Sequence, residues 1–229
     1  MKEKQPISLT DSIWFGMLLT VIGGIMDAYS YIVRGGVFAT GQTGNFVIMA
    51  LGLLSGDVPR ALRALMPVMG FFLGVFAAKH VLHRLVQHPN REVRHQRWKR
   101  NVLLVEAVLM IAVGLIPDST IHLVSNTVIA FAAALQFCSF RHFDGYSAYA
   151  TVFVTGNMRS CAEKYYEGIV LKSAESRRKA FEYTGVLAAF LVGVAIAALL
   201  APHLGIRTIW AAAVLCLVSS AWIHLKIKD

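Results

Sequence analysis

The tripeptide Thr-Gly-Asn occurs twice in the sequence, as Thr43-Gly44-Asn45 and as Thr155-Gly156-Asn157. Glycine permits a broken backbone and a close approach, and threonine or asparagine can cap a helix that follows the break. The free N–H groups and the positive dipole at such a helix start favour an anionic or carbonyl-bearing group. The alternative is that the caps only satisfy a buried break. Because the motif occurs twice at matching positions, we favour a binding or pore site.

A few further polar side chains lie within or beside apolar segments. Asp27 either ties its helix to an unwound neighbour through hydrogen bonds, or couples protons or contacts a solute. Gln136 is either a link between helices or a pore-lining residue. Gln42, Glu106 and Arg141 are secondary candidates; we expect Glu106 to snorkel or pair with a loop arginine, and Arg141 to be interfacial. No pattern indicates a catalytic residue, a metal site or a cofactor.

The composition predicts an integral membrane protein. Of the 229 residues, 56% are hydrophobic and only 15% are charged, and the mean hydropathy is +0.59. A soluble domain of this size has too much surface to hide so many apolar side chains. The net charge of +9 comes from basic residues clustered between long apolar runs, above all in residues 84–100. This clustering is typical of a cytoplasmic loop under the positive-inside rule and does not favour a nucleic-acid surface.

Apolar segments long enough to approach or cross a bilayer divide the chain into one transmembrane domain, residues 1–229. They are residues 13–33, 37–54, 62–82, 102–116, 121–140, 145–161, 181–200 and 208–225. The two segments that carry Thr-Gly-Asn (37–54 and 145–161) are interrupted by polar residues, and the second is followed at once by charges. We expect both to be discontinuous or re-entrant, since charge and irregular backbone at that depth require protein or a cavity around them.

Six full spans then remain, and every basic cluster lies on one side of the membrane. Eight spans would place the two main basic loops on opposite faces. The motifs recur at an offset of 112 residues, and the flanking run 72–78 resembles 190–198. The predicted fold is therefore all-α, with about six transmembrane helices in two inverted three-span repeats, about 12–117 and about 120–226.

The residues Gly23-Gly24-Ile25-Met26-Asp27-Ala28, Gly36-Val37-Phe38 and Thr43-Gly44-Asn45 are similar to the YoaK-like family of bacterial membrane proteins, a domain-of-unknown-function family. The second-half pattern of Gln136, Arg141, Gly145 and Thr155-Gly156-Asn157 resembles it too. The resemblance extends from about Ser12 to the last span. It implies an inner-membrane protein and supplies no substrate or reaction.

Together these features predict a small-solute transporter or channel, with a site between two broken helices and Asp27 as a proton or cation partner. An anion or a zwitterion is weakly favoured as the solute. An intramembrane enzyme and a non-transporting scaffold or sensor stay open as alternatives. The expected partners are the lipid bilayer, a solute and a second copy in a homo-oligomer, without nucleic acid. We expect a multi-pass protein of the bacterial inner membrane with both termini in the cytoplasm.

Overall fold

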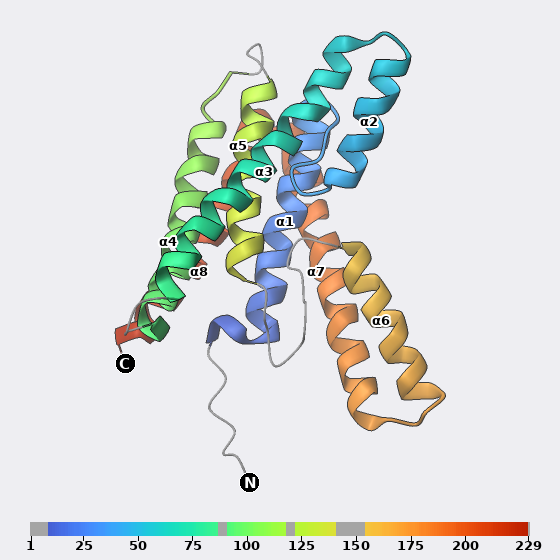
Figure 1. Ribbon diagram of the computed structural model, residues 1–229, viewed down its shortest axis with the longest axis vertical. Coiled ribbons are helices and arrows are strands. Elements are labelled where there is room, and N and C mark those ends of the chain that lie inside the picture. Colours follow the sequence, from blue (N-terminus) through green and yellow to red (C-terminus); the bar gives the residue numbers. More distant parts are fainter. Residues whose placement is uncertain (1–8, 87–90, 118–121, 141–153, 229) are drawn as a thin grey trace.

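The protein is an all-helical bundle in the computed structural model, which describes residues 9–86, 91–117, 122–140 and 154–228 (Figure 1). A 3-10 turn, η1 (Leu9–Asp11), precedes α1, and a second one, η2 (Gly205–Ile209), joins the last two helices. The α-helices in chain order are α1 (Ile13–Val33), α2 (Gln42–Leu54), α3 (Val58–Val86), α4 (Arg91–Val113), α5 (His122–Ser139), α6 (Val154–Ile169), α7 (Ala174–Leu204) and α8 (Trp210–Lys228).

Several helices are long and apolar enough to cross a membrane. Within the described ranges, four segments satisfy length and composition: α1, most of α3, α5, and a stretch of 53 residues that covers α7, η2 and most of α8. A helix rises about 1.5 Å per residue, so about 20 residues cross a hydrocarbon layer of about 30 Å. These segments make the chain a helical protein of membrane type. At 13 residues, α2 is too short to cross by itself.

α1 crosses α7 at very short range because both helices carry glycine at the crossing. A Cβ built on Gly193 would lie 2.1 Å from the carbonyl oxygen of Val21, and one on Gly24 would lie 2.3 Å from that of Phe190. Much of the remaining surface of α1 is also covered, with Phe15 and Leu19 fully buried, although Trp14 near its start and Tyr31 and Ile32 near its end are exposed. Small residues at a crossing let two backbones approach, which is how helices pack in lipid.

α3 crosses α5 in the same way. A Cβ on Gly70 would lie 2.4 Å from the carbonyl oxygen of Thr127, and one on Gly74 would lie 2.5 Å from that of Phe131. Small residues therefore lie at a helix–helix contact on both α3 and α7.

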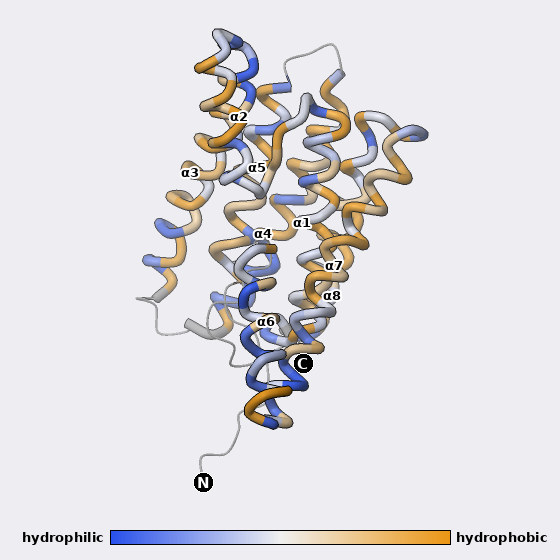
Figure 2. Tube along the Cα trace, turned by 90° about the vertical axis from the view of Figure 1, so that its right-hand side faces the viewer, coloured by the Kyte–Doolittle hydropathy of each residue, from blue (hydrophilic) through white to orange (hydrophobic). Residues whose placement is uncertain are grey.

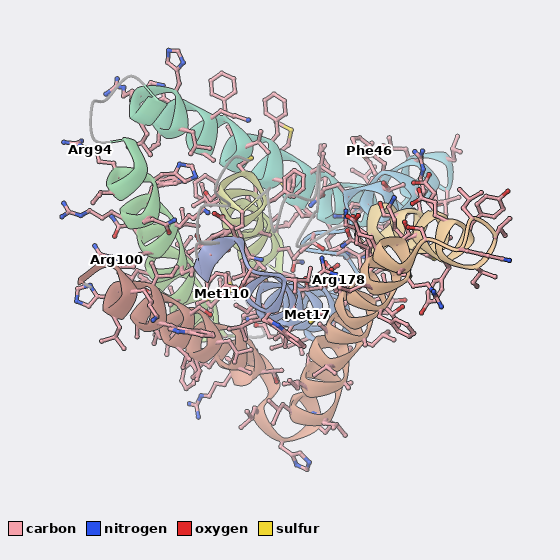
Figure 3. The ribbon with its side chains drawn as sticks, turned by 90° about the horizontal axis from the view of Figure 1, so that it is seen from below. Met17, Phe46, Arg94, Arg100, Met110 and Arg178 are labelled. Atoms are coloured by element: carbon pink, nitrogen blue, oxygen red, sulfur yellow. The ribbon has the colours of Figure 1, made fainter. Side chains whose placement is uncertain are left out.

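α4 and α8 form the third close pair, and α4 also packs on α5. The indole N–H of Trp210 at the start of α8 donates to the carbonyl oxygen of Ile111, 3.2 Å away, across Gly114. In the first half of α4, Lys99 forms a 2.7 Å ion pair with Asp11, which ties η1 to the bundle. In Figure 3, Met110 lies toward the middle of the bundle, and Arg94 and Arg100 lie at its edge.

α2 and α6 are short flanking helices, with α2 packed on α3 and α6 packed on α7. Figure 1 shows that both begin near the mid-height of the bundle and run toward opposite ends. The η1 turn, the end of α3, the start of α4, the α6–α7 turn and the end of α8 lie toward one end of the bundle. Figure 2 shows hydrophilic residues gathered at this end, mainly on α6.

Helix limits differ from the predictions where charged residues continue a helix beyond its apolar part. The predicted loop 84–100 is mostly helix, because α3 extends to Val86 and α4 begins at Arg91. The prediction for residues 181–200 was also too short. α7 begins at Ala174, where the Ser173 hydroxyl accepts a hydrogen bond from the Ser176 amide as an N-cap. Lysine, arginine and glutamate are good helix formers, so an exposed helix does not end where its apolar segment ends.

Candidate functional site

The chain reverses direction directly after α1. Gly35 and Gly36 have φ values of 91° and 76°, a left-handed backbone that favours glycine. The link then runs back beside α1, so that Thr40 meets Asp27. Asp27 lies six residues before the last residue of α1, which corresponds to about 9 Å of helix. The link therefore brings the chain back along α1, so that α2 begins beside α1 and about 9 Å before the end of that helix.

The Asp27 carboxylate holds this link in place. It accepts hydrogen bonds from the backbone amide of Thr40 at 2.7 Å and from the Thr40 hydroxyl at 2.5 Å. The amides of Ala39 and Gly41 also lie within its reach, and the side chain is 7% exposed. The protein's own carboxylate thus satisfies the amides that precede α2. Of the two interpretations open for Asp27, this geometry directly supports the bond that ties a helix to an unwound neighbour.

Asn45 fixes the same link from the other side. Its Oδ1 accepts from the Phe38 amide at 2.9 Å, and its Nδ2 donates to the Phe38 carbonyl at 2.6 Å and to Gln42 Oε1 at 2.9 Å. Gln42 in turn donates to the Ala39 carbonyl at 2.8 Å. The prediction that Thr43 or Asn45 caps the following helix was wrong. The N-cap of α2 is Gly41, without a side-chain cap, and Asn45 instead pairs with the backbone before the helix.

Gly44 allows the Phe38 ring to approach closely, but it does not lie at the backbone break. It is within α2, and a Cβ there would lie 2.9 Å from Cδ2 of Phe38. The Phe38 ring, held against Gly44, also stacks on Tyr31 with ring centroids 5.2 Å apart. The positive φ values that reverse the chain belong to Gly35 and Gly36, outside the Thr-Gly-Asn motif.

The second motif opens α6 as the first opens α2. In both motifs the threonine is exposed and the asparagine is buried: Asn45 is 0% exposed and Asn157 is 3% exposed. Gly156 is exposed, with no heavy atom within 4 Å of a Cβ built on it. Arg141, a secondary candidate, lies outside the described residues, as does the chain that leads into α6.

Gln136 and Glu106 lie on other helix contacts. Gln136 on α5 donates to the Leu19 carbonyl of α1 at 3.2 Å, which is the interhelical link anticipated as one of its two roles. The expectation that Glu106 would snorkel was wrong. It is 0% exposed, and its Oε2 accepts a long 3.8 Å contact from the Cys216 thiol of α8. Asp27, Gln42 and Asn45 all bind the link between α1 and α2, whereas Gln136 and Glu106 lie elsewhere.

Arg34 is an organising residue that the predicted site does not include. Its side chain is 0% exposed; Nε donates to the Tyr29 hydroxyl, and one terminal nitrogen donates to the carbonyls of Val113 and Ile116. The Arg34 carbonyl accepts from Asn126 at 2.7 Å. Arg34 therefore closes the end of α4, where a cation suits the negative end of the helix dipole. Its position directly before Gly35-Gly36 was the available sequence signal.

Comparison with known proteins gives a family and no assigned activity. No curated protein and no solved structure matches the chain. One family model, described as "Protein of unknown function (DUF1275)", matches residues 15–222, which include nearly all of α1, α2 to α7 in full and most of α8. This agrees with the resemblance to a family of unknown function. The chain belongs to the DUF1275 family.

Proposed function

We propose that the protein is a small-solute transporter or channel of the bacterial inner membrane. In this proposal six helices span the bilayer in two inverted three-span repeats, and the solute passes near the starts of α2 and α6. The observation that carries the proposal is the link after α1, which returns about 9 Å along that helix and holds Thr40 on Asp27. Irregular backbone at such depth is tolerated where it is enclosed by protein or lines a cavity.

The matched helix crossings support the inverted repeats. Gly74 of α3 faces the Phe131 carbonyl of α5, and Gly193 of α7 faces the Val21 carbonyl of α1. The two glycines are 119 residues apart (193 − 74), and the two carbonyl residues are 110 apart (131 − 21). Each short helix packs on the helix that follows it, and the two short helices run toward opposite ends. An odd number of spans in each repeat would produce this inversion.

The polar groups on the link favour a zwitterion or a solute accompanied by a proton. The positive start of α2 would attract an anionic group, but Asp27 already lies against the amides there. A simple anion would meet that carboxylate. A solute with both charges can pair with Asp27 and with a helix start, and a proton on Asp27 would remove the repulsion.

Flux into proteoliposomes tests the proposal. The purified protein is reconstituted and challenged with neutral amino acids, small carboxylates and inorganic anions, with empty liposomes as the baseline. We expect at least one class to cross above the baseline, and Asp27→Asn to remain folded and lose that flux. Glu175→Gln removes an exposed carboxyl near the α6–α7 turn, away from the proposed path, and should retain the flux. Wild-type flux in Asp27→Asn, or no flux for any class, would contradict the proposal.

The second candidate is a non-transporting scaffold or sensor, which the filled interior of the bundle favours. Phe15 and Leu19 of α1, with Leu103 and Met110 of α4, are each 0% exposed. This candidate predicts no flux for any solute, and it predicts a binding partner at the end of the bundle that carries the basic residues and the α6–α7 turn. An intramembrane enzyme is less favoured, because the carboxyls that it would pair have separate partners: Asp27 binds Thr40, and Glu106 contacts Cys216.

A further inference from the structure

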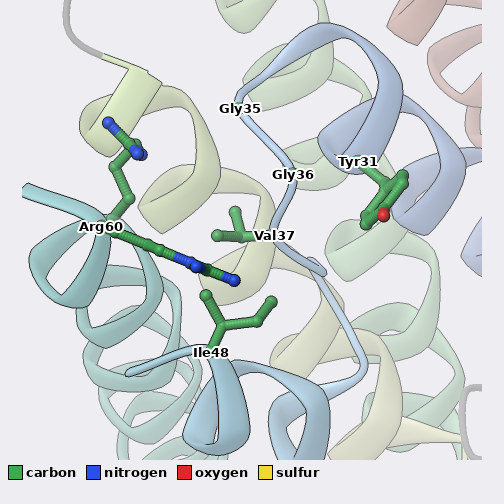
Figure 4. Close-up of a pocket in the computed structure, with 7 residues that line it drawn as sticks. Tyr31, Gly35, Gly36, Val37, Ile48 and Arg60 are labelled. Carbon is green, nitrogen blue, oxygen red and sulfur yellow. The ribbon is translucent and has the colours of Figure 1, made fainter. Parts of the chain in front are cut away.

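A small hollow lies at the opposite end of the bundle from the basic clusters, where the link after α1 passes α2 and α3. Its volume is about 270 Å³, and it is lined by Tyr31, Gly35, Gly36, Val37, Ile48, Arg60 and Arg63. Figure 4 shows Tyr31 and the two glycines on one side, Arg60 on the other, and Val37 and Ile48 between them. A hollow of this size accommodates a small group rather than a large cofactor.

Two arginines from the first turns of α3 supply its charge. Arg60 and Arg63 are three residues apart, a spacing that places them on one face of a helix. Among the described residues, neither forms an ion pair within 4.0 Å. The nearby carboxyl of Asp57 accepts from the backbone amide of Arg60 at 3.0 Å, as a cap on α3. The Cδ of Arg63 also lies 3.5 Å from the position of a Cβ on Gly35, so the link passes close to this side chain.

In the proposed orientation, these two arginines lie away from the cytoplasmic end. Basic residues of membrane proteins concentrate at the cytoplasmic end, which in the proposed orientation is the end of the bundle where α3 ends, α4 begins and α6 turns into α7. Arg60 and Arg63 are at the other end, beside a hollow. Arginine is suited to phosphate and carboxylate groups because its planar fork can donate two parallel hydrogen bonds.

We propose that this hollow binds an anionic phosphate or carboxylate group through Arg60 and Arg63. The group could belong to a free solute or to the headgroup of an anionic lipid, since both present the same oxygens to the guanidinium groups. The proposal concerns binding at the end of the bundle opposite to the α6–α7 turn, and it does not depend on transport.

Binding is measured on the purified full-length protein in neutral detergent and in lipid nanodiscs. The free-anion arm is a calorimetric titration with inorganic phosphate and with succinate. The lipid arm compares phosphatidylglycerol with phosphatidylcholine retained by the protein in native mass spectrometry. The test variant is Arg60→Gln/Arg63→Gln, and the matched control is Arg207→Gln. Arg207 is an exposed arginine of η2, at the same end, whose guanidinium lies over Trp210.

We expect the double variant to lose at least about tenfold in affinity for the anion in one arm, with Arg207→Gln unchanged. One charge-assisted hydrogen bond is sufficient for an effect of this size. Loss in the phosphate or succinate arm assigns a free anion, and loss confined to phosphatidylglycerol assigns a lipid headgroup. If the double variant does not fold, Arg63→Lys, which keeps the charge and loses the fork, should still weaken binding. Wild-type protein that binds none of these anions, or equal losses in the double variant and Arg207→Gln, would overturn the proposal.

Discussion

Gly193 gives the sharpest test of how the helices are packed. A Cβ added at this position would lie 2.1 Å from the carbonyl oxygen of Val21 and 3.0 Å from the amide nitrogen of Ile25. Both atoms belong to the backbone of α1, so no side chain can rotate away to make room. Gly193→Ala therefore has to separate α7 from α1.

The required movement follows from the same distances. Ordinary van der Waals contact begins at 3.4 Å, so the oxygen is too close by about 1.3 Å (3.4 − 2.1). Adding atoms to a well-packed contact costs about 1–3 kcal/mol, and rigid backbone atoms on the other side place this case near the upper limit. For a chain of this length, about 3 kcal/mol corresponds to a decrease of about 6–12 °C in Tm.

Thermal unfolding of the purified variants in one detergent measures this effect. Gly74→Ala should give a decrease of similar size, because the added Cβ would lie 2.5 Å from the Phe131 carbonyl oxygen at the equivalent crossing. Gly156→Ala is the stability control, since no heavy atom lies within 4 Å of its Cβ position. A Gly193→Ala protein that unfolds within about a degree of wild type would refute the close α1–α7 crossing.

Three further predictions concern other parts of the chain. Asp27→Ala should destabilise the protein by at least about 2 kcal/mol, measured by chemical unfolding in detergent, because buried donors lose a charged acceptor; an unchanged midpoint would contradict the role of the carboxylate in holding the link. Hydrogen bonds, chiefly from Lys164, hold the pKa of Glu167 below its ordinary value of 4.5; its ionised form therefore stabilises the fold above about pH 4.5 and loses this effect as the pH falls further. Glu167→Gln should have a lower Tm than wild type at pH 7, and the two Tm values should be closer together near pH 3. A difference in Tm that is the same at both pH values would refute this pairing. In a cysteine-free background, Ser55→Cys and Glu175→Cys should react with an impermeant maleimide from opposite sides of the membrane; reaction from the same side would refute the proposed orientation.

Much of the fold could be predicted because apolar length is a property of contiguous residues. The predicted first span, residues 13–33, coincides with α1. The early start of α4 at Arg91 could not be predicted from hydropathy, since its first turns are charged and depend on helix propensity alone. The length of α7 depends on the Ser173 N-cap, a local hydrogen bond outside the apolar segment.

The candidate site could be predicted in its residue types and not in its contacts. Asp27 and Asn45 stood out because polar groups in an apolar segment need partners. Their partners, Thr40 and Phe38, are defined by a chain reversal at Gly35-Gly36 that hydropathy does not reveal. The contacts of Arg34 could not be predicted because its partners are far away in the sequence. Its acceptors are backbone carbonyls about 80 residues away, and backbone groups leave no mark in a sequence.

Water access to the starts of α2 and α6 tests the central claim most directly. Thr43 and Thr155 occupy matching places in the two motifs, and both side chains are exposed. Each is changed to cysteine in a cysteine-free protein in membranes and treated with a small, charged, membrane-impermeant thiosulfonate. We predict that both cysteines react, more slowly than cysteines placed at positions 55 and 175, and that a transported solute slows the reaction. If neither cysteine reacts while positions 55 and 175 do, the two helix starts face lipid or packed protein, and the proposed path does not exist.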